Sequence, residues 1–203
     1  MTTFRFKAPI DEAHVREPRV GDSVYISGLM ITARDQAHRR SLEYFRTGKP
    51  IPVSFKESVV YHCGPIAVND GSQWKIVAAG PTTSTRMEPY EAEFIQTFRP
   101  RIFVGKAGMG SKTAQAAKKF GVIYCDFTGG AAVLAAEKIR AVKGVEWYDL
   151  GMPEALWILE VEEFGPATVT IDSHGNNLHE VVQRSAQERV PEILKALKVP
   201  QES

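Results

Sequence analysis

Residues 101–130 read RIFVGKAGMGSKTAQAAKKFGVIYCDFTGG and contain the alternation that decides the fold. A short apolar strand, 101–105, leads through a glycine-rich loop to a helix over 112–120, with Gly121 as its stop. The next apolar strand, 122–127, follows at once. A strand, a loop, a helix and a strand in this order predict parallel strands that are connected by a helical crossover.

The same pattern continues on both sides of this segment. The expected strands cover 23–28, 58–64 and 74–80, and the expected helices cover 36–47, 90–98 and 131–143. Asp35 is the expected N-cap of the first of these helices, and Pro89 fits the first turn of the second. Three strand, loop and helix units in a row favour a parallel sheet with helical crossovers.

The C-terminal part of the chain has a different pattern. Strands are expected at 145–150, 156–164 and 167–173, with no helix between them. The final residues read as a helix that Pro191 breaks. A pure doubly wound sheet is therefore excluded, and the expected fold class is α/β with a mixed sheet.

The composition is that of a globular protein. Of the 203 residues, 43% are hydrophobic and 24% are charged, which excludes a disordered chain, a collagen and a pure coiled coil. We expect one domain over residues 1–203. It would have an N-terminal arm or edge strand over about residues 1–20 and a C-terminal helical tail over about 178–203.

Charge and apolar runs exclude several classes of partner. Lys and Arg total 25 against 24 Asp and Glu, so neither nucleic acid nor a membrane surface is an expected partner. No apolar run approaches the roughly 20 residues of a membrane span, and residues 1–18 lack the apolar core of a secretory signal. Cys63 and Cys125 form no CxxC pair and suit a reducing cytoplasm, where they would be small buried hydrophobes.

Three loops that follow expected strands each carry a cation. Arg34 follows the first strand, Arg86 lies in the hydroxyl-rich loop 81–87, and Lys106 opens the glycine-rich loop. If the strands are parallel, their carboxyl ends share one edge of the sheet, so the three cations could converge on one anion. Each loop alone has a plainer interpretation: an Arg34–Asp35 surface pair, a solvated Arg86, and a tight glycine turn.

The glycine-rich loop does not match either of two common nucleotide-binding motifs. The Walker pattern needs Lys directly after its second glycine, but Gly110 is followed by Ser111, and Lys112 comes one place late. The G-x-G-x-x-G fingerprint cannot be laid on these glycines either. What remains is an anion site made by backbone N–H groups at a helix N-terminus, or a purely structural turn.

The histidines and Asp126 carry weaker signals. His62 and Cys63 are neighbours in an expected strand and point to opposite faces, so they cannot chelate one metal ion together. His174 and His179 flank a Gly-Asn-Asn turn, and a structural role is favoured over a metal role for all of these histidines. Asp126 fits a helix cap better than a catalytic acid. No metal site is expected on this chain.

Five motifs in a fixed order resemble those of one enzyme family. They are GDSVYISGLMITARDQAH at 21–38, YHCGP at 61–65, AAGPTTSTRM at 78–87, GKAGMG at 105–110 and DFTGGAA at 126–132. Over roughly residues 10–185 the chain resembles the C-terminal, or beta, part of class I fumarases and of the similar L-tartrate dehydratases. The resemblance implies a swivelling β/β/α domain. It also implies a hydro-lyase that hydrates fumarate reversibly to L-malate, a step of the tricarboxylic acid cycle.

The resemblance also implies residue roles and a partner. The residues that match carboxylate-binding positions of the family are Arg34, Arg86 and Lys106. Thr82, the first threonine of GPTT, matches the proposed general base, and Thr83 and Gly105 are possible supporting residues. The family uses a [4Fe–4S] cluster whose cysteines lie in the alpha part. The resemblance therefore implies a separate alpha subunit that carries the cluster in a heterotetramer, and no cofactor on this chain alone.

The chemistry of the residues agrees with these implications. A small dicarboxylate substrate needs two or three cations, and arginine forks orient carboxylates better than lysine does. Dehydration of malate also needs a Lewis acid at the departing hydroxyl, which a chain with two cysteines cannot supply. Threonine is a poor base unless a cation such as Lys106 favours its alkoxide.

Two other functions remain open from the sequence. L-tartrate dehydratase uses the same scaffold, although overall motif likeness favours fumarase. In another class, the chain could be a non-catalytic anion-binding or nucleotide-binding module. The isolated chain could form a homodimer through the apolar surface that an absent partner would leave exposed.

Overall fold

Five parallel strands form the centre of the protein, whose computed structural model describes residues 1–197. They are β1 (Thr3–Lys7), β2 (Ser23–Thr32), β3 (Val59–Tyr61), β6 (Ile102–Gly105) and β7 (Ile123–Asp126). Two antiparallel strands, β9 (Leu156–Ile171) and β8 (Ile139–Glu146), complete a sheet of order β1-β2-β3-β6-β7-β9-β8. The expected α/β fold with a mixed sheet is confirmed.

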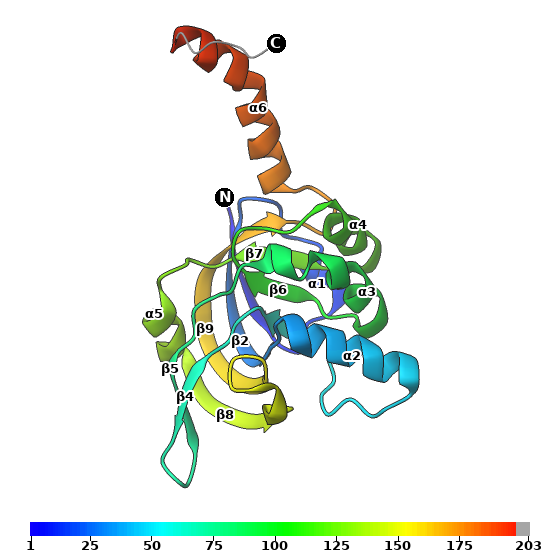
Figure 1. Cartoon of the computed structure of the whole chain (residues 1–203), viewed down its shortest axis with the longest axis vertical. Helices are drawn as coiled ribbons and strands as arrows, with labels where there is room; N and C mark the ends of the chain where they lie inside the picture. The colour runs from blue at the N-terminus through cyan, green and yellow to red at the C-terminus, as the bar shows by residue number, and fades with distance from the viewer. Residues whose placement is uncertain (198–203) are drawn as a thin grey trace.

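The long strand β9 closes the sheet on itself. It pairs with β7 on one side and also with β2, so β2, β3, β6, β7 and β9 form a closed ring (Figure 1). Irregular register between β9 and its neighbours accompanies its curvature. The sequence predicted two strands here, but the segment from 156 to 171 is one continuous strand that bends instead of breaking.

Alternating side chains divide the apolar residues into two cores. Tyr61 and Val104 point into the ring, whereas Val60 and Phe103 point outward. The outward face is covered by α2 (Asp35–Thr47), α3 (Glu88–Phe98) and α4 (Ser111–Phe120), which lie together on one side in Figure 1. All four residues are fully buried, so both cores contribute to stability.

A hairpin and a short helix cover another part of the ring. The hairpin consists of β4 (Ile66–Asn69) and β5 (Trp74–Ala78), and the helix is α5 (Ala132–Glu137). Residues 74–80 were expected to form a parallel strand of the main sheet, but β5 pairs only with β4 and is antiparallel to it. Helix α5 was expected to reach residue 143 but ends at Glu137, because the chain pairs with β9 from Ile139 onward.

The observed helix ends can be compared with the capping residues that the sequence predicts. Gly48 and Gly121 adopt the left-handed conformation after α2 and α4, and Pro89 lies in the first turn of α3, as expected. Asp35 is not the N-cap of α2: Arg34 takes that position, and Asp35 is the first helical residue. Its carboxylate is therefore free to pair with another loop.

The last described element is α6 (Leu178–Ala196), which projects away from the rest of the protein in Figure 1. Pro191 does not break it, contrary to expectation, since the helix continues to Ala196. The end of the expected tail, residues 198–203, lies outside the described residues. The remaining short helices are α1 (Glu12–Val15), η1 (Ser84–Arg86) and η2 (Tyr148–Leu150). No helix among residues 1–197 is long and apolar enough to cross a membrane.

Candidate functional site

The carboxyl ends of the parallel strands meet at one edge of the sheet. Because β2, β3, β6 and β7 run in the same direction, the loops that follow them emerge together. These loops carry Arg34, the segment 62–64, Lys106 and the segment 127–130. The loops that carry Arg34 and Lys106 thus share this edge, as strand direction predicts.

The loop with Thr82 and Arg86 reaches this edge by another route. It follows the β4–β5 hairpin, not a parallel strand, so the argument from strand direction does not apply to it. Backbone contacts hold it in place: the Thr82 N–H donates to the His62 carbonyl at 2.7 Å, and the Ser84 N–H donates to the Lys106 carbonyl at 2.9 Å. The four candidate residues, Arg34, Thr82, Arg86 and Lys106, therefore belong to neighbouring loops.

The two arginines are held by carboxylates from other segments. Arg34 Nε lies 3.3 Å from Glu154 Oε1, and Arg86 Nη2 lies 2.8 Å from Asp35 Oδ2. The expected Arg34–Asp35 surface pair is not formed, since Asp35 connects the two arginine loops through Arg86. The Arg34 side chain is 19% exposed and that of Arg86 is 50% exposed, so both can meet a ligand from solvent.

Lys106 has a different environment. Among the described residues, no carboxylate lies within 4.0 Å of its ammonium group. Its backbone pairs with Thr83, and its aliphatic stem lies near Gly129. Lys106 and Thr82 are both half-buried. Lys106 is thus a cation available to an added anion beside the threonine loop.

Gly105 is required by the approach of the next loop. A Cβ at this position would lie 1.9 Å from Ser84 Oγ and 2.9 Å from the Tyr124 hydroxyl. Ser84 Oγ is itself held by His62 Nδ1 at 2.8 Å and accepts from the Lys106 N–H at 3.3 Å. Gly105 therefore lets the strand end and the hydroxyl-rich loop come into contact.

The N-terminus of α4 already holds an anion from this chain. Glu88 accepts hydrogen bonds from the Gly110 N–H at 2.7 Å and from the Thr113 hydroxyl at 2.6 Å. The Thr113 N–H also donates to Glu88, at 3.3 Å. The helix N-terminus that was considered as a ligand site is thus satisfied internally by a carboxylate.

Asp126 connects the glycine-rich loop to α6. It accepts from the Gly108 N–H at 3.2 Å and from the Tyr124 hydroxyl at 3.0 Å, and it pairs with His179 Nε2. It does not cap α5, whose N-cap is Ala131, so the cap expectation was wrong. His174 contacts Arg19 instead of His179, so the two histidines do not form a pair.

A buried cluster under the loops was missed by sequence reasoning. His38 and His62 face Glu91, with Nε2 to Oε2 distances of 3.5 Å and 3.2 Å, and all three side chains are fully buried. Their ligand-type atoms lie within 4.8 Å of one another, so by residue type the cluster could hold a metal ion. No spacing signal identifies it, because the three residues come from α2, the end of β3 and α3.

Burial and mutual charge shift the pKa values within this cluster in different directions. Burial lowers the pKa of His62. Burial also opposes a charge on His38, but the Glu91 carboxylate raises the pKa of His38 above its usual value. Burial would raise the pKa of Glu91, yet the two imidazoles lower it to about 2. These directions favour an ionised Glu91 beside a charged His38 and a neutral His62.

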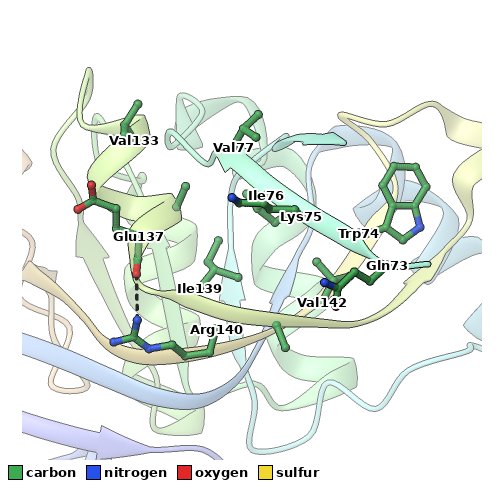
Figure 2. A pocket seen from close by; sticks show the side chains of 12 residues that line it. Gln73, Trp74, Lys75, Ile76, Val77, Val133, Glu137, Ile139, Arg140 and Val142 are labelled. Carbon is green, nitrogen blue, oxygen red and sulfur yellow. Dashed lines mark hydrogen bonds between the residues drawn. The ribbon is translucent and has the colours of Figure 1, made fainter. Parts of the chain in front are cut away.

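Two of the larger hollows in the protein are lined by none of the four candidate residues. One cavity of about 660 Å³ lies between β5, α5 and β8, with Trp74, Ile76 and Val133 among its lining residues (Figure 2). None of the four candidate residues lines it. A second hollow of about 680 Å³ lies between the glycine-rich loop and the start of α6, where Thr85 and His179 contribute to its wall.

Comparison with known proteins agrees with the motif resemblance. The family model described as the fumarase C-terminus matches residues 2–182. The chain belongs to the fumarase C-terminus family. The matched region contains all four candidate residues and ends within α6, so most of that projecting helix lies beyond it.

Similar proteins of the fumarase C-terminus family carry two kinds of name. The chain is 45% identical over 170 residues to the L(+)-tartrate dehydratase subunit beta of Escherichia coli (strain K12), covering 84% of this chain and 83% of the relative. It is 44% identical over 185 residues to a putative class I fumarate hydratase of Geobacillus stearothermophilus, covering 91% of this chain and 35% of the relative. A putative L(+)-tartrate dehydratase subunit beta of Methanocaldococcus jannaschii is 41% identical, with 89% and 93% covered.

The cysteines of this fumarase C-terminus chain do not suit an iron–sulfur cluster. Cys63 and Cys125 are both fully buried inside the ring of strands, among apolar residues. Burial raises the pKa of both thiols, which disfavours the thiolate that iron requires. Two cysteines are also fewer than the four that a cluster takes. The chain's own cysteine residues therefore do not fit this group.

Proposed function

We propose that this chain is the beta subunit of an iron–sulfur-dependent hydro-lyase that hydrates fumarate reversibly to L-malate. The observation that carries the proposal is the meeting of Arg34, Arg86, Lys106 and Thr82 on neighbouring loops at one edge of the sheet. Family membership adds support, because the matched region spans all four residues.

The cations would bind the two carboxylates of the substrate. Glu154 and Asp35 hold the Arg34 and Arg86 guanidinium groups in defined positions, with ordinary ion-pair distances. A substrate carboxylate can share or replace these partners through the remaining N–H groups of each arginine fork. Lys106, which has no such carboxylate among the described residues, would supply the third positive charge.

Thr82 would transfer the proton. In the dehydration direction, its oxygen would take the proton from the carbon next to a carboxylate as the hydroxyl leaves the neighbouring carbon. The C–H electron pair then becomes the second bond of the alkene. A threonine alkoxide needs a positive neighbour at neutral pH, and Lys106 is the available cation, since the Thr83 and Lys106 backbones are paired.

The cluster would belong to a partner. Because the cysteines of this chain do not suit it, we propose that a [4Fe–4S] cluster is carried by an alpha subunit, in a heterotetramer of two alpha and two beta chains. The steps assigned to this chain are carboxylate binding and proton transfer. A cytoplasmic location would fit its two reduced, buried thiols.

L(+)-tartrate is the second candidate substrate. Two of the relatives named above are a tartrate dehydratase beta subunit and a putative one, and the chain covers most of each. Tartrate has one more hydroxyl than malate, and identities of 45% and 44% do not separate the two activities. The same cations and the same threonine would serve either substrate.

Reconstitution tests the proposal. The chain is mixed anaerobically with its alpha subunit, iron and sulfide, and fumarate hydration and tartrate dehydration are assayed side by side. We expect turnover of one substrate by the complex and none by the chain alone. Turnover by the metal-free chain alone would refute the need for a partner. A fully loaded complex that is inactive on both substrates would refute the hydro-lyase function.

A further inference from the structure

The proton positions in the buried cluster follow from its hydrogen-bond partners. His38 Nδ1 lies 2.8 Å from the Arg34 carbonyl oxygen, which can only accept, so Nδ1 carries a proton. If His38 were neutral, the bare Nε2 would face the Glu91 carboxylate, and two acceptors would meet in a fully buried space. A second proton, on Nε2, removes this conflict and makes His38 an imidazolium.

His62 needs no charge to satisfy its contacts. Its Nδ1 lies 2.8 Å from the Ser84 hydroxyl, which can donate, so the proton of a neutral His62 can lie on Nε2 and face Glu91. Ser84 Oγ can then still accept from the Lys106 N–H. One imidazolium, one carboxylate and one neutral imidazole therefore account for the Nδ1 contacts and the ion-pair distances. Among the described residues, Nε2 of both histidines and both Glu91 oxygens form no hydrogen bond, so the attraction to Glu91 is that of an ion pair.

A metal ion accounts for the cluster less well. Two imidazoles and one carboxylate supply three ligands, whereas a closed zinc site takes four. Ser84 is already engaged by His62 and Lys106, and the rings of Phe94 and Phe103 pack against the histidines. Among the described residues no fourth His, Cys, Asp or Glu joins the group.

The cluster contacts the loops of all four candidate residues. His38 binds the Arg34 carbonyl, the His62 carbonyl accepts from the Thr82 N–H, and Ser84 is the first residue of the turn that carries Arg86. Through Ser84 Oγ it also reaches the Lys106 N–H. Each loop is thus linked to the cluster, the Thr82 loop through the His62 backbone and the others through the His38 and Ser84 side chains.

We infer that the cluster is a buried ion pair between a His38 imidazolium and the Glu91 carboxylate, beside a neutral His62. These positioning residues hold the carboxylate-binding loops and the Thr82 loop in fixed positions relative to one another. The catalytic consequence of this inference rests on the proposed function, whereas the existence of the ion pair does not depend on it. Loss of the charge would loosen the Arg34 and Ser84 loops relative to each other. A displacement of about 1 Å at such loops can cost about 10²-fold in rate.

Within residues 1–197, few other charged or titratable groups face this cluster. Asp35 of α2 favours the charged form of both histidines. The Tyr124 ring of β7 lies near His62, with ring centroids 6.3 Å apart. Glu91 remains the partner of opposite charge in direct contact with both imidazoles, so its removal is the sharpest perturbation.

Nitrogen-15 NMR of the histidine rings in the full chain tests the ion pair without any activity. We expect both ring nitrogens of His38 to be protonated at neutral pH, and His62 to be neutral with its proton on Nε2. In Glu91→Gln, His38 should become neutral at the same pH. The wild-type spectrum decides the matter even if Glu91→Gln does not fold. A neutral His38, or one equivalent of bound metal in the purified chain, would overturn the inference.

Kinetics of the reconstituted complex test the positioning role. Glu91→Gln should lower kcat/KM by about 10-fold to 100-fold. The kcat/KM of the wild-type complex should fall by a similar factor as the pH rises and His38 loses its proton. Glu93→Gln is the matched control, because Glu93 lies on the same helix and pairs with exposed Arg46, and it should keep wild-type kinetics. An active complex whose Glu91→Gln form matches wild type would overturn the positioning role. If the wild-type complex is inactive, the proposed function fails, and the NMR result still judges the ion pair.

Discussion

Replacing Gly105 with alanine tests the contact on which the loop arrangement depends. The added Cβ would lie 1.9 Å from Ser84 Oγ, whereas real Cβ contacts essentially never fall below 3.0 Å. Ser84 Oγ would have to retreat by about 1 Å or more, and Tyr124 and His62 crowd the same space. The hydrogen bond from Ser84 to buried His62 would be lost.

The expected destabilisation can be assembled from these two effects. Overpacking of this kind costs about 1–3 kcal/mol, and an unsatisfied buried ring nitrogen costs about 1–3 kcal/mol more. Gly105→Ala should therefore lower the free energy of unfolding by about 2–6 kcal/mol. For a chain of this size, that corresponds to a melting temperature lower by about 4–24 °C.

Urea unfolding followed by circular dichroism measures the effect. Gly129→Ala is the matched control, because its Cβ would meet only the Lys106 stem, at an ordinary 3.6 Å. Gly105→Ala/Ser84→Ala should recover part of the loss, since the obstructing hydroxyl is gone. If Gly105→Ala is as stable as Gly129→Ala, or if adding Ser84→Ala to Gly105→Ala restores no stability, the two loops do not approach each other as closely as described.

Three further predictions concern the site and the thiols. In the reconstituted complex, Thr82→Val should lower kcat by about 10²–10⁴-fold because the base is lost, with KM nearly unchanged; steady-state kinetics that instead show the loss in Thr83→Val would move the base by one residue. Arg86→Met should mainly raise KM for the dicarboxylate, because one carboxylate fork is lost, and an unchanged KM would remove Arg86 from the binding site. Cys63 and Cys125 should not react with a thiol reagent in the native chain and should both react in urea, because both are fully buried; rapid native labelling would contradict that burial.

Local patterns in the sequence determined much of the architecture. The strands at β2, β3, β6 and β7, the helices α2, α3 and α4, and the glycine stops at 48 and 121 all follow from periodicity and backbone preferences that act within a few residues. Strand direction then predicted that Arg34 and Lys106 share one edge of the sheet. Family membership could likewise be inferred from ordered motifs alone.

Tertiary structure decided the features that depend on distant partners. Residues 74–78 have the composition of a central strand, yet they form a hairpin, because strand pairing is chosen by the neighbours that are available and not by propensity. The same holds for β8, which replaces the end of an expected helix because β9 offers it a pairing edge. Asp35 is the first residue of α2 and not its N-cap, and its carboxylate pairs with Arg86, fifty-one residues away in the chain.

The buried His38–Glu91–His62 cluster is the clearest case of what sequence alone could not supply. Each residue looks ordinary in its own segment: a histidine on a helix, a glutamate in the next helix and a histidine at a strand end. Only the packing of α2 and α3 against β3 brings them together away from water. Charge interactions between buried groups depend on distance and desolvation, which are properties of the folded chain and have no local signature in the sequence.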